Sequence, residues 1–115
     1  MIDLAMRVIQ QSLDGLAARQ RVIAENIANV DTPGFHAGRV SFEDNLRTAI
    51  DKGDSPNSVG ISTSRSTEAT RTNGNNVNVD DENVSLIETQ LRYQLAVDSM
   101  NAKFRILRTS MRRDS

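Results

Sequence analysis

Apolar side chains recur at alternating steps of four and three residues from Ile2 to Val30, with Gln20 as the one polar member. This spacing is that of a heptad seam, and it predicts an α-helix from Met1 to about Asn29. Asp3 is expected to cap its start, and Gly15 should weaken its interior by roughly 1 kcal/mol relative to alanine. The apolar members of the seam are Ile2, Met6, Ile9, Leu13, Leu16, Ile23, Ile27 and Val30.

The same spacing returns near the C-terminus and predicts a second long helix over residues 79–115. Asp80 is expected to cap it, and the acidic first turn suits the positive end of the helix dipole. Its last part is basic and carries no acid from 103 to 113. The apolar members of this seam, in which Gln90 is the polar exception, are Leu86, Tyr93, Val97, Met100, Phe104, Leu107 and Met111.

A strongly specified turn ends the first helix. Pro33 cannot continue a helix and keeps the residue before it out of the helical region. Gly34 can take the positive φ of a type II turn, and Asn29 is predicted to be a left-handed C-cap. The residues of this turn motif are Ala28, Asn29, Thr32, Pro33, Gly34 and Phe35.

The middle of the chain combines a short helix with a polar loop. Ser41 is expected to cap a helix over about 42–52 that Gly53 ends. Residues 53–78 are rich in Ser, Thr, Asn and Gly, so they bury too little apolar surface to offset their ordering entropy. We therefore expect a disordered linker, or a loop that is ordered only against a partner, with at most an edge strand at 59–61.

These elements predict an all-α fold in which the two long terminal helices form an antiparallel, coiled-coil-like hairpin, with a short middle helix and a largely irregular polar loop. The expected segments are 1–34, 35–78 and 79–115. Both seams are wider than one partner helix can cover, which favours assembly with copies or relatives. The predicted assembly residues are Ile9, Leu13, Leu16, Ile23, Ile27, Leu91, Tyr93, Val97, Met100, Phe104 and Leu107.

Composition narrows the function further. The chain has 115 residues, a net charge of −1, no cysteine and a single histidine, His36. No apolar run is long enough to span a membrane, no secretory signal is recognisable, and composition alone would indicate a cytosolic protein. A lone loop histidine completes no catalytic or metal-ligating set, so we expect no enzyme, cofactor or metal site.

Two parts of the sequence resemble one protein family. Residues 26–35, which read Asn-Ile-Ala-Asn-Val-Asp-Thr-Pro-Gly-Phe, resemble the signature of bacterial flagellar rod and hook proteins. Residues 75–80 and the Gln-Leu-Arg-Tyr-Gln segment at 90–94 are similar to the C-terminal part of the short proximal rod proteins. The resemblance covers roughly residues 1–50 and 74–113, and two paralogous proximal rod proteins, FlgC among them, remain candidates.

This resemblance implies a structural subunit of the drive shaft that crosses the periplasm, with terminal helices packed into an inner tube. It implies export by the flagellar type III apparatus without a cleaved signal peptide. The implied partners are copies of the chain, the rod proteins FlgC, FlgF and FlgG, the rod-to-ring adaptor FliE and the MS-ring protein FliF. Outside the family, a cytoplasmic coiled-coil adaptor remains an alternative, as does an RNA or lipid binder that uses the basic helix end.

Overall fold

The structure is a computed structural model, and it describes residues 3–113. Ile2, at the start of the predicted seam, and residues 114–115 lie outside this range. The order of elements is α1 (Leu4–Ala28), β1 (Gly38–Ser41), α2 (Glu43–Lys52), a 3₁₀ turn η1 (Pro56–Ser58), β2 (Ser62–Arg65) and α3 (Val79–Arg113). The molecule is elongated, with principal extents of 67 × 27 × 14 Å.

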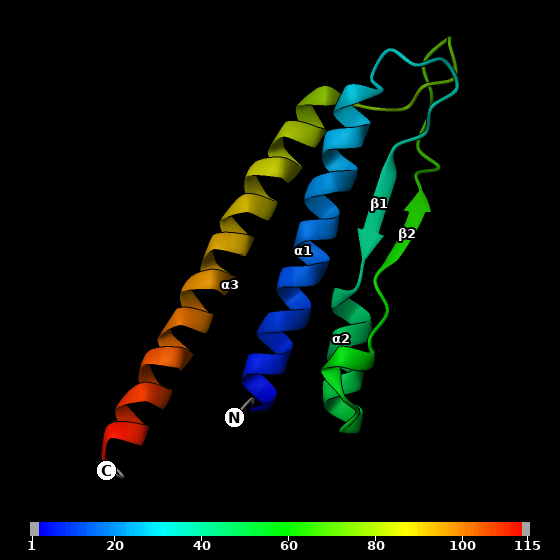
Figure 1. Ribbon diagram of the computed structural model, residues 1–115. Coiled ribbons are helices and arrows are strands. Elements are labelled where there is room, and N and C mark those ends of the chain that lie inside the picture. The colour runs from blue at the N-terminus through cyan, green and yellow to red at the C-terminus, as the bar shows by residue number, and fades with distance from the viewer. Residues whose placement is uncertain (1–2, 114–115) are drawn as a thin grey trace.

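Helix α1 lies in the middle of the molecule, between α3 on one side and α2 with the two strands on the other (Figure 1). Helices α1 and α3 run antiparallel, as predicted. Their register is marked by two contacts, Lys103 with Asp3 at 3.1 Å near one end and Asn26 with Glu82 at 3.1 Å near the other. The hairpin of two long terminal helices is therefore confirmed.

The description as all-α is only approximate, because β1 and β2 form a small antiparallel sheet in which Gly38 pairs with Arg65 and Ser41 with Ser62. The strand expected at 59–61 is misplaced, since β2 starts at Ser62. The sequence conceals this strand because its residues, Ser-Thr-Ser-Arg, are all exposed and show no apolar alternation.

Residues 53–78 are held against the rest of the same chain by hydrogen bonds, which differs from both expectations, a disordered linker and a loop ordered only against a partner. Backbone groups and side-chain amides of this segment form hydrogen bonds with residues far away in the sequence. For example, the carbonyl of Val59 accepts from the Gln11 side chain at 2.6 Å. Hydrogen bonds to α1 and to the turn replace the apolar burial that this segment lacks.

The largest cluster of buried apolar side chains lies between α1, α2 and the strands. Phe42 is 2% exposed and fills the centre of this core. Leu16 of α1 shares this core with Leu46 and Ala49 of α2, so part of the wide apolar face of α1 is buried inside one chain. The core consists of Leu16, Val40, Phe42, Leu46, Ala49 and Val59.

Of the predicted helix ends, two are confirmed. The Asp3 carboxylate accepts a hydrogen bond from the Met6 N–H at 2.8 Å and caps α1. Gly53, with φ of 76°, ends α2 in the left-handed conformation. Both fit the ordinary chemistry of helix termini.

The other predicted caps differ from the structure. Asn29 is the C-cap of α1, as predicted, but its φ of −106° is not the left-handed conformation that was expected. Ser41 does not cap α2, because it belongs to β1 and pairs with Ser62. The N-cap position is occupied by Phe42, whose side chain makes no capping hydrogen bond. Asp80 already lies inside α3, and the side chain of Asn78 accepts the hydrogen bond from the Asp81 N–H at 3.2 Å.

Candidate assembly site

The turn after α1 has the geometry that its sequence predicts. The Phe35 N–H donates to the Thr32 carbonyl at 3.2 Å, which closes a four-residue turn around Pro33 and Gly34. Gly34 has φ of 74°, the positive value that the third position of a type II turn requires. Phe35 is half-buried beneath the Arg65 guanidinium, 5.3 Å from the ring centroid. The turn therefore sends the chain from α1 toward β1 in a defined direction.

A second segment holds this turn from outside. The side-chain amide of Asn75, which is 0% exposed, donates to the carbonyls of Asn29 and Thr32, both at 2.8 Å. The Gly34 N–H donates to the Asn73 carbonyl at 2.9 Å. One buried asparagine thus gives a second hydrogen bond to each of two carbonyls, which also accept from the Thr32 and Phe35 N–H groups.

Two neighbours of Asn75 extend this contact. The Arg71 guanidinium donates to the carbonyls of Val30 and Val77. The Asn76 side chain accepts from the Ala37 N–H at 2.7 Å and donates to the Ser66 carbonyl at 3.1 Å. We call Arg71, Asn75 and Asn76 the turn clasp. Sequence analysis missed its role, although the run of asparagines at 73–78 was visible.

Replacing Asn75 with alanine is expected to lower the free energy of unfolding by about 2 kcal/mol. The buried Val77 N–H loses its acceptor, and the carbonyls of Asn29 and Thr32 each lose one of their two donors. Chemical denaturation followed by circular dichroism measures this loss. Asn57→Ala is the matched control, because Asn57 is exposed and its side chain forms one long hydrogen bond, at 3.5 Å, within residues 3–113. Equal stabilities of the two variants would contradict the role of the clasp.

The start of α3 is joined to α1 and β1 by a buried polar cluster. Glu82 is 2% exposed, and its carboxylate accepts from Arg39 at 2.8 Å and from the Asn26 amide at 3.1 Å. Asn26 is 0% exposed and also bonds both backbone groups of Gly38, accepting from its N–H at 2.8 Å and donating to its carbonyl at 3.0 Å. This cluster sets the position of α3 relative to the turn.

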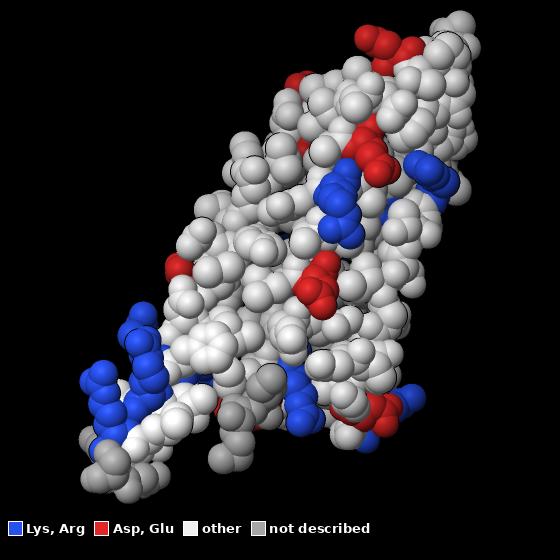
Figure 2. Space-filling view, in the orientation of Figure 1, with Lys and Arg blue, Asp and Glu red and all other residues white. Residues whose placement is uncertain are grey.

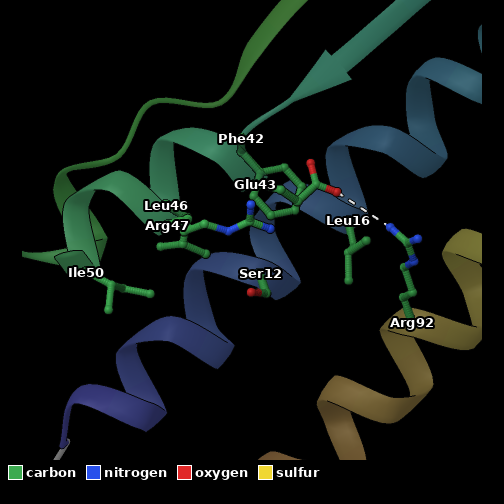
Figure 3. Close-up of a pocket in the computed structure, with 8 residues that line it drawn as sticks. All are labelled: Ser12, Leu16, Phe42, Glu43, Leu46, Arg47, Ile50 and Arg92. Atoms are coloured by element: carbon green, nitrogen blue, oxygen red, sulfur yellow. Dashed lines mark ion pairs between the residues drawn. The ribbon is translucent and has the colours of Figure 1, made fainter.

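A groove of about 330 Å³ lies between α1 and α2 and reaches α3. Apolar side chains form much of its wall, and Glu43 and Arg92 lie at its edge, joined by an ion pair of 3.7 Å (Figure 3). Glu43 also pairs with Arg19 at 2.6 Å. The side chains that line the groove are Ser12, Leu16, Phe42, Glu43, Leu46, Arg47, Ile50 and Arg92.

The Arg19 hydrogen bond holds the pKa of the Glu43 carboxyl below its ordinary value of 4.5. A carboxyl whose pKa is lower in the folded state stabilises the fold above its unfolded pKa, and this contribution is lost as the pH falls through the folded pKa. Because the side chain is 40% exposed, solvent screening keeps the contribution under about 1 kcal/mol.

We expect the difference in unfolding free energy between the wild type and Glu43→Gln to be greatest near neutral pH and to shrink as the pH falls below about 4.5. Denaturation at a series of pH values measures it, and a carboxyl NMR titration reports the pKa of Glu43 directly. Asp44→Asn, at an exposed neighbouring position, is the control. A difference that stays constant with pH would contradict the assignment.

The predicted assembly residues occupy three different environments. Leu16 and Ile23 are buried, Leu16 in the core beneath α2. Leu91 and Phe104 are 67% and 46% exposed. Between these extremes are the half-buried members, which are Ile9, Leu13, Ile27, Tyr93, Val97, Met100 and Leu107. The single seam predicted from the sequence is therefore divided among buried, half-buried and exposed positions.

Helix α3 carries a second apolar face that points away from α1. Its members recur at helical spacing, and each is at least 59% exposed. We call this the outer face of α3. On the side of α3 away from α1, no other element of residues 3–113 lies beside the helix (Figure 1). The outer face consists of Val84, Ile87, Leu91, Leu95 and Ile106.

The described part of the chain contains no cluster of three or more His, Asp or Glu side chains that could hold a metal ion. His36 is exposed in the loop before β1. None of the helices in the described range is long and apolar enough to cross a membrane. The notable surfaces are thus helix faces and a clasped turn.

Comparison with known proteins identifies the family. Residues 6–36 match the model of the family described as flagella basal body rod protein. The chain is 35% identical over 114 residues to flagellar basal body rod protein FlgB of Bacillus subtilis (strain 168), covering 88% of each chain, and 37% identical over 115 residues to FlgB of Borrelia hermsii, covering 82% of each. It is 28% identical to FlgB of Escherichia coli (strain K12), covering 90% of each. The chain therefore belongs to the FlgB family of flagellar basal body rod proteins.

Proposed function

We propose that this chain is a structural subunit of the proximal rod that polymerises through its two terminal helices. Its membership of the rod family makes it a structural part of the flagellar basal body. The relatives favour FlgB over the paralogue FlgC. The observation that carries the polymerising role is the outer face of α3, whose five apolar side chains have no partner among the described residues.

In an isolated chain this face stays exposed to water and adds nothing to the stability of the fold. Contiguous exposed apolar surface usually marks a contact with another protein. A second helix laid on the face would bury it at the helical spacing of its residues. The residues of α1 that were expected to drive assembly are partly covered by α2, so α3 offers the larger free surface.

In this proposal residues 1–34 and 79–115 supply the inner-tube helices, and residues 35–78 form the outer part of the subunit. The turn clasp holds the junction between the two parts at one angle, which every copy must repeat. The rod crosses the periplasm, and the chain reaches it through the flagellar type III export apparatus. The proposed neighbours are FlgC, FlgF, FlgG, FliE and FliF, together with copies of the chain itself.

Leu91→Asp tests the role of the outer face. Because Leu91 is 67% exposed, the stability of the chain should change by less than about 0.5 kcal/mol, while a charge placed in a desolvated helix contact should block assembly. The measurement is the amount of the variant in purified basal bodies, with swimming in soft agar as a second readout. Leu16→Asp would not serve, because Leu16 is part of the core and the variant would unfold.

Gln90→Asp is the matched control, since Gln90 is exposed on the same helix but is polar. It should assemble and swim like the wild type. Normal incorporation of Leu91→Asp would show that the outer face makes no essential contact. Restriction of the wild type to the cytosol of cells with a working exporter would support a cytoplasmic adaptor instead.

A further inference from the structure

The C-terminal end of α3 extends past the start of α1. Lys103 pairs with Asp3, the residue that caps α1, so among residues 3–113 no other helix continues beside the part of α3 that follows residue 103. Described residues 104–112 form this overhang, which is about 13 Å long at 1.5 Å per residue. Phe104, Ile106 and Met111 are 46%, 66% and 65% exposed. Apolar side chains therefore point outward from more than one side of the overhang.

The overhang is also basic. Arg105 and Arg108 are exposed, and neither forms an ion pair with any described residue. Lys and Arg side chains gather at this end of the molecule in Figure 2. We call residues 104–112 the basic end.

The opposite end of the molecule, where α1 meets the turn and α3 begins, is acidic. Glu25, Asp31, Asp80 and Asp81 are all exposed there, and none has an ion-pair partner in the described range. Acidic side chains lie at this end in Figure 2. Exposed apolar groups accompany them, because Val84 and Ile87 are 62% and 59% exposed close by on α3. We call this the acidic end.

We propose that the basic end of one copy docks on the acidic end of a second copy, so that copies associate head to tail. This inference rests on the proposed function, and it names the partner and the surfaces of one contact. The two ends are complementary in charge, and each carries apolar groups that the contact would cover. Because they lie at opposite ends of one elongated molecule, the contact leaves a free end on each side and permits growth beyond a dimer.

Charge and size make this contact weak by itself. A helix segment about 13 Å long buries less than the roughly 1,200 Å² typical of a stable interface. Its ion pairs are exposed, so salt should screen them. In solution such a contact should therefore form only at high protein concentration and low ionic strength.

The test uses the full-length chain and two charge reversals. Arg105→Glu with Arg108→Glu reverses the basic end, and Glu25→Lys with Asp31→Lys reverses the acidic end. Asp80 and Asp81 are left in place because they stabilise the first turn of α3. Sedimentation velocity at low ionic strength measures the concentration at which association is half complete.

The wild type should form species larger than a dimer as its concentration rises, and added salt should disperse them. Each reversal should raise the concentration for half association by about tenfold or more. An equimolar mixture of the two reversed chains should recover association, because each reversed end again meets an opposite charge. Arg47→Glu with Lys52→Glu, at exposed sites on α2 that belong to neither end, should associate like the wild type.

A wild type that stays monomeric, a closed dimer that grows no further, or a mixture that fails to recover would each overturn the head-to-tail contact. Failure of the proposed function has a separate readout, which is absence of the wild type from purified basal bodies. A chain that is present in basal bodies but never associates in solution would refute this contact and leave the rod function intact.

Discussion

Replacing Asn26 with leucine is expected to lower the free energy of unfolding by about 3–5 kcal/mol, although the two side chains have similar volumes. Asn26 is 0% exposed and makes three hydrogen bonds, two with the backbone of Gly38 and one with the Glu82 carboxylate. The variant leaves a buried N–H unpaired and removes a donor from a buried charge, and each loss costs on the order of 1–3 kcal/mol or more. A domain of this size has only about 6–15 kcal/mol of stability to lose.

Urea denaturation measures the change, and Asn45→Leu is the control because Asn45 is exposed on α2. The Asn26 variant should also lose the fixed position of α3 relative to the turn. Amide hydrogen exchange should therefore become faster in the first turns of α3 than in α2. A loss of stability similar to that of the control would show that water replaces the three bonds and that the cluster is not structurally important.

The long helices and the turn were predictable because their signals are local and periodic. The steps of four and three along α1 and α3, the Pro33-Gly34 pair and the αL glycine at 53 each depend on a few neighbouring residues. The same periodicity could not assign faces to partners. A heptad seam indicates that one side of a helix is buried, but it does not indicate which element buries it. Here residues of α2 and of α3 both pack on α1.

The turn clasp and the buried polar cluster could not be predicted from the sequence, for a different reason. Asn75 bonds to carbonyls more than 40 residues away, and Asn26 bonds to Glu82 across 56 positions. Such bonds have no spacing to detect in a single sequence. In the sequence, Asn75 is one of many polar residues that make 53–78 look like a loop, and Asn26 is one polar residue of α1. The order of the middle segment was therefore not predicted.

Gly15 of α1 packs closely against the ring of Phe42 in the core. The sequence marks Gly15 as a weak point of the helix, but a Cβ built there would lie 2.4 Å from atoms of the Phe42 ring. The glycine therefore makes room for the ring, which fills the centre of the core at 2% exposure. In the wild type, Gly15→Ala should be destabilising by about 1–3 kcal/mol, because overpacking outweighs the gain in helix propensity.

Phe42→Ala should cost about 3–5 kcal/mol, since it removes the ring from the core. In that background the sign of Gly15→Ala should reverse, giving up to about 1 kcal/mol of added stability, because the clash is gone and only the helix propensity of alanine remains. A double-mutant cycle by chemical denaturation measures this coupling. Gly60→Ala, at a glycine with open space around it, is the control and should show no coupling to Phe42. Additive effects of the Gly15 and Phe42 changes would mean that the ring does not depend on the missing side chain at position 15.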